Sequence, residues 1–81
     1  MDKEQVKESL KQFFIDNLGI DASILKYDSE LFGDEIGLDS VDSLEIISFV
    51  DGEYEVSMTG VAKENFKSID TIADYIVANK K

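Results

Sequence analysis

The chain has 81 residues, 43% of them apolar, which suits one small hydrophobic core and is too apolar for a disordered protein. It contains no cysteine, no histidine and no arginine. This composition excludes disulfides, thiolate metal sites and bidentate clamps on phosphate. Since it also excludes the usual general base, it argues against an enzyme.

The net charge of −10 is confined to the middle of the chain. Residues 28–61 contain ten acidic residues and no basic one, whereas the rest of the chain balances eight acidic residues with eight lysines. Nucleic acid is excluded as a partner because its phosphates would be repelled. The acidic region is either a solvated face or a surface that steers basic partners toward the protein.

Nothing in the sequence predicts a membrane protein or an exported one. No run of about 18 apolar residues is present, so no membrane-spanning helix and no membrane partner are expected. Residues 1–4 lack the basic start and the apolar stretch of a signal peptide. A cytoplasmic location is therefore expected.

Apolar residues at helical spacing predict a first helix over residues 3–18, with Gly19 in the usual position of a helix stop. Residues 20–38 predict a long connection, because their apolar residues follow no clear period. We expect these scattered apolar residues to pin the connection onto the core. An irregular loop of that length is uncommon and usually functional.

A second helix is predicted from about Ser40 to about Asp51, and Gly52 is expected to end or fray it. One short helix fits residues 61–66, and Ser68 is in the position of an N-cap for the last helix. The buried face predicted for the second helix consists of Val41, Leu44, Ile46, Ile47 and Val50. The buried face predicted for the last helix consists of Ile69, Ile72, Ala73, Ile76 and Val77.

The predicted fold is therefore all-α. It is a small bundle of three longer helices plus one short helix, with a long loop between the first two helices. The length allows one domain, over residues 1–81. The aromatic residues fit the core, but the roles of Phe49 and Tyr54 stay open.

Residues 37–47 hold the most informative motif of the chain. They contain a glycine, an apolar residue, Asp39-Ser40 and an apolar residue, then two variable positions and the pair Leu44-Glu45. This pattern resembles the attachment-site signature of acyl carrier proteins. The resemblance extends to the long loop before the serine and to residues 66–69 and 74–76, so the chain is identified as a free-standing member of that family.

The resemblance implies that Ser40 carries the phosphopantetheine arm. The alternative serine, Ser43, lacks the glycine three positions earlier and the apolar-Glu pair four and five positions later. A serine in the first turn of a helix is also accessible to a modifying enzyme. The unpaired N–H groups and the partial positive charge of a helix N-terminus would help to hold a phosphodiester there. The competing interpretation is that Ser40 only caps the helix.

The resemblance also implies the function. A phosphopantetheinyl transferase would attach 4'-phosphopantetheine covalently to Ser40 from coenzyme A. The arm would hold acyl intermediates as thioesters and present them to acyl-transferring and chain-extending enzymes that have basic docking patches. The chain itself would be a monomer and not an enzyme. The residues expected to recognise partners are Asp39, Val41, Asp42 and Glu45. The residues expected to line an acyl pocket are Leu44, Ile47 and Ile72, with ordinary core packing as their alternative role.

The pathway and the acyl chain stay open. Fatty-acid biosynthesis is one candidate, and a specialised carrier for polyketide, aryl-polyene or lipid-modification chemistry is the alternative. Outside the carrier class, a calcium-binding regulatory module is considered, because residues 28–39 place acids and a glycine at loop positions 1, 3, 6 and 12 of an EF-hand. Phe32 offers no oxygen at loop position 5, so no specific metal site is expected.

Overall fold

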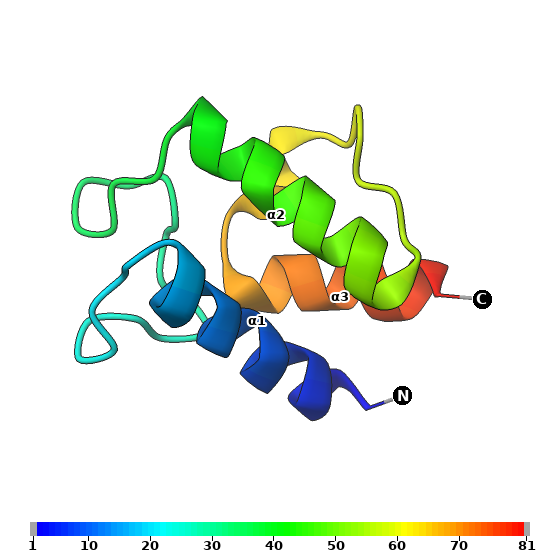
Figure 1. Ribbon diagram of the computed structural model, residues 1–81, viewed down its shortest axis with the longest axis horizontal. Coiled ribbons are helices and arrows are strands. Elements are labelled where there is room, and N and C mark those ends of the chain that lie inside the picture. The colour runs from blue at the N-terminus through cyan, green and yellow to red at the C-terminus, as the bar shows by residue number, and fades with distance from the viewer. Residues whose placement is uncertain (1, 81) are drawn as a thin grey trace.

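The computed structural model describes residues 2–80 and confirms the all-α bundle. Three α-helices are present, α1 (Lys3–Asn17), α2 (Ser40–Tyr54) and α3 (Ile69–Asn79), with a 3-10 turn η1 (Lys63–Phe66) before the last one. Residues 2–80 contain no strand. Figure 1 shows α2 lying across α1 and α3, with the long loop after α1 at one end and both chain termini at the other. No helix in this part of the chain is long and apolar enough to cross a membrane.

The first helix agrees with its prediction. The Asp2 carboxylate accepts a hydrogen bond from the backbone N–H of Glu4 and caps the N-terminus. Val6, Leu10 and Phe14 are buried at a spacing of four residues, so they form one stripe along the helix. The backbone at Gly19 has a φ of 69°, which glycine adopts without the steric cost of a Cβ.

The last helix also begins as predicted. The Ser68 hydroxyl accepts a hydrogen bond from the backbone N–H of Thr71, whose own hydroxyl accepts one from the backbone N–H of Ser68. Four of its five predicted core residues are buried, but Val77 is 41% exposed. Val77 lies about 80° around the helix from Ile69 because a turn takes 3.6 residues, which places it at the edge of the buried face.

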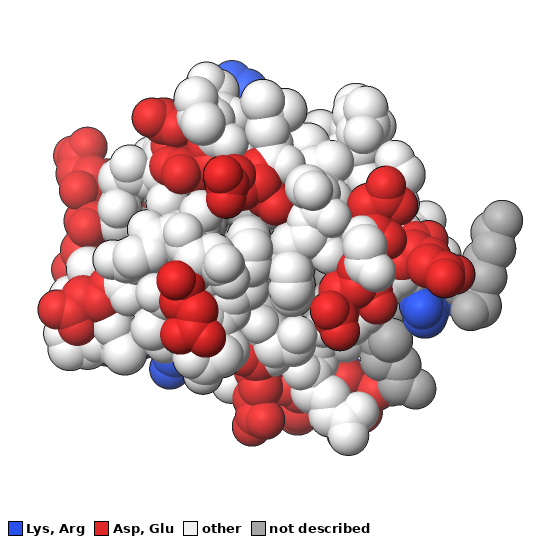
Figure 2. Space-filling model, viewed as in Figure 1, with Lys and Arg blue, Asp and Glu red and all other residues white. Residues whose placement is uncertain are grey.

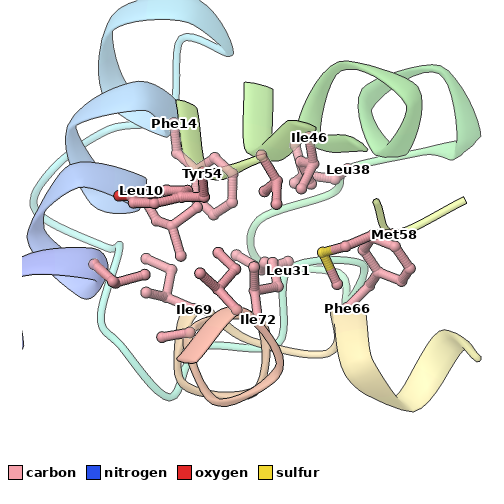
Figure 3. Packing of buried hydrophobic residues seen from close by; sticks show 14 of the residues in the cluster. Leu10, Phe14, Leu31, Leu38, Ile46, Tyr54, Met58, Phe66, Ile69 and Ile72 are labelled. Carbon is pink, nitrogen blue, oxygen red and sulfur yellow. The ribbon is translucent and has the colours of Figure 1, made fainter. Parts of the chain in front are cut away.

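The predicted face of α2 is only partly correct: Ile46 and Val50 are buried as predicted and Ile47 is half-buried, but Val41 and Leu44 are not buried. Val41 and Leu44 are 64% and 65% exposed, whereas α2 buries Ile46, Val50 and Tyr54. Apolar residues occur around most of this helix, so spacing alone did not select the side that meets α1 and α3. Figure 3 shows the result: Tyr54 of α2 lies against Leu10 and Phe14 of α1, while Ile46 lies near Leu38 of the loop before α2.

The predicted end of α2 is wrong. The helix continues through Gly52 to Tyr54, and Glu55 ends it in the left-handed conformation with a φ of 57°. The Lys80 ammonium donates a hydrogen bond of 2.8 Å to the Tyr54 carbonyl, one of those that helix ends leave without a partner. Burial of the Tyr54 side chain offsets the roughly 1 kcal/mol by which glycine weakens a helix interior.

We expect Gly52→Ala to raise the free energy of unfolding by roughly 0.5–1 kcal/mol. A Cβ at this position meets nothing within 4 Å, so the gain comes from the backbone alone. Urea denaturation measures it. Gly60→Ala is the matched control, because its Cβ also meets nothing within 4 Å but its φ is +76°, where alanine is strained. Stabilisation by both substitutions, or by neither, would contradict this account.

The long loop before α2 is fixed to the rest of the fold, as predicted. Its buried side chains are Ile20, Leu25, Leu31 and Leu38. The backbone N–H of Leu31 donates to the Lys67 carbonyl at 2.9 Å, and that of Asp70 donates to the Tyr27 carbonyl at 3.0 Å. The N–H of Leu38 donates to the Leu31 carbonyl. This hydrogen bond joins the two ends of residues 31–38, the segment that comes just before Ser40.

Candidate attachment site

Ser40 is the first residue of α2, and the residue that caps this helix is Asp39. The Asp39 carboxylate accepts hydrogen bonds from the backbone N–H groups of Val41, at 3.0 Å, and Asp42, at 3.2 Å. The Asp42 carboxylate accepts one from the backbone N–H of Asp39 at 3.1 Å, which completes a capping box. Because Asp39 provides the cap, the interpretation that Ser40 is only an N-cap is wrong.

The two serines of the motif differ in what their hydroxyls do. Ser40 is exposed, and its hydroxyl makes no hydrogen bond to any residue from 2 to 80. The Ser43 hydroxyl donates to the Ser40 carbonyl at 2.7 Å, and Ser43 is half-buried. Of the two, Ser40 therefore has the freer and more accessible nucleophilic oxygen.

One expectation about the helix N-terminus needs correction. The N–H groups of Val41 and Asp42 already donate to Asp39, so they are not free to hold a phosphodiester on Ser40. The carboxylates of Asp39 and Asp42 instead place negative charge beside that serine. The partial positive charge of the helix end is thus largely neutralised by the protein's own cap.

The four predicted recognition residues lie together at the start of α2, but they differ in exposure. Asp39, Val41 and Glu45 are exposed, whereas Asp42 is half-buried because its carboxylate turns back to the N–H of Asp39. Asp42 therefore offers less of its side chain to a partner than the other three residues do. Leu44, which was predicted to face inward, is exposed next to them. Figure 2 shows acidic side chains gathered over both ends of α2 and along the loop before it.

A cavity of about 660 Å³ lies beside Ser40, on one side of α2. Its apolar lining comes from Phe32, Ile47, Met58, Val61 and Phe66. Met58 is fully buried, and Figure 3 shows its sulfur against the Phe66 ring. No periodicity in residues 57–60 marks this segment as part of the core. A lone methionine between polar residues was the only signal that it turns inward.

The structure does not bring the three predicted pocket residues together. Ile47 lines the cavity beside Ser40. Leu44 instead lines a groove of about 530 Å³ on the other side of α2, with Phe13 and Phe49 of α1 and α2. Ile72 is fully buried in the core and does not line either hollow. Leu44 and Ile47 are only about 60° apart around the helix, but α2 presents its 46–50–54 stripe to the core, so Ile47 lies at the edge of the buried face whereas Leu44 is turned toward solvent.

Comparison with known proteins identifies the family. A family model described as "Phosphopantetheine attachment site" matches residues 8–76. An acyl carrier protein of Clostridium acetobutylicum is 35% identical over 74 residues, which cover 91% of this chain and 95% of that protein. This chain belongs to the acyl carrier protein family. The carrier is also similar to the acyl carrier protein of Onion yellows phytoplasma, with 32% identity over 91% of this chain and 96% of that protein. The acyl carrier protein of Chlorobium phaeobacteroides is 29% identical over 95% of this chain and 97% of that protein.

Membership of the family confirms three predictions. The protein is a carrier and not an enzyme, and its cofactor is phosphopantetheine. As a member of the family, the carrier interacts with a phosphopantetheinyl transferase and with biosynthetic enzymes. The residues fit such a group, because a free and exposed hydroxyl stands at the rim of a cavity lined by apolar side chains.

The calcium-binding alternative finds no support in the structure. Among residues 2–80, no group of three or more acidic side chains is arranged to hold a metal ion. Asp39 is the last of the loop positions that suggested an EF-hand. Its carboxylate is already engaged in capping α2. The family match accounts for the chain without a calcium site.

Proposed function

We propose that Ser40 is the residue that carries the phosphopantetheine arm, and that residues 1–81 act as one monomeric carrier domain. The observation that carries the proposal is the free, exposed hydroxyl of Ser40 at the first position of α2 and at the rim of the cavity. Attached there, the arm would supply the thiol on which acyl groups are held as thioesters. The intermediates would belong to fatty-acid synthesis or a related pathway.

The residues around Ser40 have distinct parts in this function. The Asp39–Asp42 capping box fixes where α2 begins, and therefore where the Ser40 hydroxyl points. The cavity beside it offers Ile47, Met58 and Val61 as an apolar environment for an acyl chain. On the exposed side, Val41 and Glu45 offer one apolar and one acidic contact to a partner enzyme with a basic docking patch.

The test is direct attachment. The purified protein is incubated with coenzyme A and a phosphopantetheinyl transferase of broad specificity, and its mass is then measured. We expect the mass to increase by one phosphopantetheine group, and peptide mapping to place that group on Ser40. Attachment to Ser43, or no attachment at all, would contradict the proposal.

We expect Glu45→Lys to slow attachment of the arm by roughly tenfold at low ionic strength, because it removes a charge that steers the basic transferase to the helix. Glu45 makes no hydrogen bond or ion pair within residues 2–80, so the fold should be little changed. The measurements are the rate of attachment at low and at high salt and the melting temperature. The difference in rate should shrink at high salt.

Glu53→Lys is the control for Glu45→Lys, since Glu53 is an exposed acid at the far end of the same helix. It should change the rate less than Glu45→Lys does. Equal slowing by both variants would show that only the net charge matters, and an unchanged rate for Glu45→Lys would show that the acidic face is merely solvated. Asp42 is unsuitable for this test because its carboxylate belongs to the capping box.

A further inference from the structure

A phosphodiester attached to Ser40 would carry a negative charge that the first turn of α2 does not neutralise. A phosphodiester on Ser40 would share the first turn of α2 with the carboxylates of Asp39, the N-cap, and Asp42. The helix cannot compensate fully, because the N–H groups of Val41 and Asp42 are bonded to Asp39. Since like charges at close range repel, a cation from elsewhere in the fold would stabilise the loaded serine.

Two lysines are placed to provide a cation near Ser40. Lys63, the first residue of η1, and Lys67, which follows η1, line the same cavity as Ser40. The placement follows from the fold, because the Leu31 N–H donates to the Lys67 carbonyl and ties η1 to the loop that leads into Ser40. The central acidic stretch of the sequence has no lysine of its own, so only tertiary structure supplies one here.

The lysines at the cavity differ from those at the other end of the molecule. Lys3 is paired with Asp74 at 2.6 Å, and Lys7 lies 2.9 Å from Glu4 and 3.5 Å from Asp70. The hydrogen bond with Glu4, with Asp70 adding to its effect, raises the pKa of Lys7 above its usual value. The pairs with Asp70 and Asp74 join α1 to α3, the pair with Glu4 lies within α1, and none of them involves Ser40.

Lys63 and Lys67, in contrast, are exposed and form no ion pair within residues 2–80. Glu30 and Glu64 also line the cavity, but neither carboxylate lies within 4.0 Å of a lysine nitrogen in the described chain. The rim is thus formally neutral before the arm is attached. A phosphodiester adds one negative charge, which two flexible and unpaired ammonium groups can approach without breaking an existing pair.

We propose that Lys63 and Lys67 hold the phosphodiester of the arm on Ser40, so that the arm leaves the serine over the mouth of the cavity. This inference rests on the proposed function of Ser40. The two lysines act as positioning residues through charge-assisted hydrogen bonds to the phosphate oxygens. They direct the arm toward the apolar lining of the cavity and away from the carboxylates of Asp39 and Asp42.

The test uses the loaded protein and observes the phosphate itself. Wild type, Lys63→Gln, Lys67→Gln and the double variant are each loaded with the arm, and mass spectrometry confirms the attachment. Phosphorus-31 NMR then measures transverse relaxation of the phosphodiester. We expect slower relaxation in the variants, and the largest change in the double variant, because a released phosphate moves more freely. The difference should shrink between salt at about 0.01 M and at about 1 M, where the Debye length falls from about 30 Å to about 3 Å.

Two controls separate positioning from a general effect of charge. Lys26→Gln removes an exposed lysine that does not line the cavity, so the phosphorus signal should stay as in wild type. The Lys63→Arg, Lys67→Arg double variant keeps both charges and should restore the wild-type relaxation. Identical phosphorus relaxation in loaded wild type and the loaded double glutamine variant would overturn this inference alone. Failure of the wild type to accept the arm on Ser40 would instead overturn the proposed function.

Discussion

Ser40→Ala is expected to abolish attachment of the phosphopantetheine arm completely, whereas Ser43→Ala should be loaded at close to the wild-type rate. In the proposed function the phosphodiester forms on the Ser40 hydroxyl oxygen, and alanine has no hydroxyl. The Ser43 hydroxyl is half-buried and donates to the Ser40 carbonyl, so it is not presented to a transferase. The measurement is the increase in protein mass after incubation with coenzyme A and the transferase, followed over time for both variants.

Both serine variants must be shown to be folded for this comparison to count. Ser40 is exposed and its side chain makes no hydrogen bond within residues 2–80, so its alanine variant should melt within a few degrees of wild type. Alanine also favours a helix more than serine does. If folded Ser40→Ala accepted the arm, or if folded Ser43→Ala did not, the attachment site would be Ser43 and not Ser40.

Ile46→Ala is expected to lower the free energy of unfolding by about 2–5 kcal/mol, because the Ile46 side chain is fully buried between the helices. That is a large share of the roughly 5–15 kcal/mol that stabilises a small domain. The melting temperature should fall by roughly 10–30 °C. Thermal denaturation followed by circular dichroism measures the change.

Leu44→Ala is the matched control, since it removes a similar aliphatic side chain from the same helix two residues earlier. Leu44 is 65% exposed, so the substitution should change the free energy of unfolding by no more than about 0.5 kcal/mol. If Leu44→Ala destabilised the protein as much as Ile46→Ala, α2 would present the face that its sequence alone predicted. The pair therefore tests the orientation of the helix on which the site depends.

The local signals of the sequence were sufficient for the elements and for the motif. Ser68 capped α3 as predicted, and Gly19 followed α1 as predicted, because caps and stops depend on backbone groups within a few residues. The position of Ser40 in its motif was sufficient to predict the family, which the match over residues 8–76 confirmed. Each of these features involves neighbours in the chain, so no knowledge of the packing was needed.

The orientation of α2 was decided by the tertiary structure alone. Its apolar residues surround the helix, and the buried face became defined only when Ile46, Val50 and Tyr54 joined the common core. The same packing carried α2 through Gly52, because the burial of Tyr54 outweighed the weak helix propensity of one residue. Local propensities of about 1 kcal/mol cannot predict an outcome that burial of a large side chain decides.

The surroundings of Ser40 also depended on contacts between distant segments. Met58, Phe66 and Lys63 come from the region after α2, and they line the cavity only because η1 packs against the loop before Ser40. Their spacing in the sequence carries no sign of this. The sequence by itself determined which serine matches the motif. The fold decided which apolar and basic side chains surround that serine, because these contacts join segments that are far apart in the chain, and no local pattern encodes which distant segments meet.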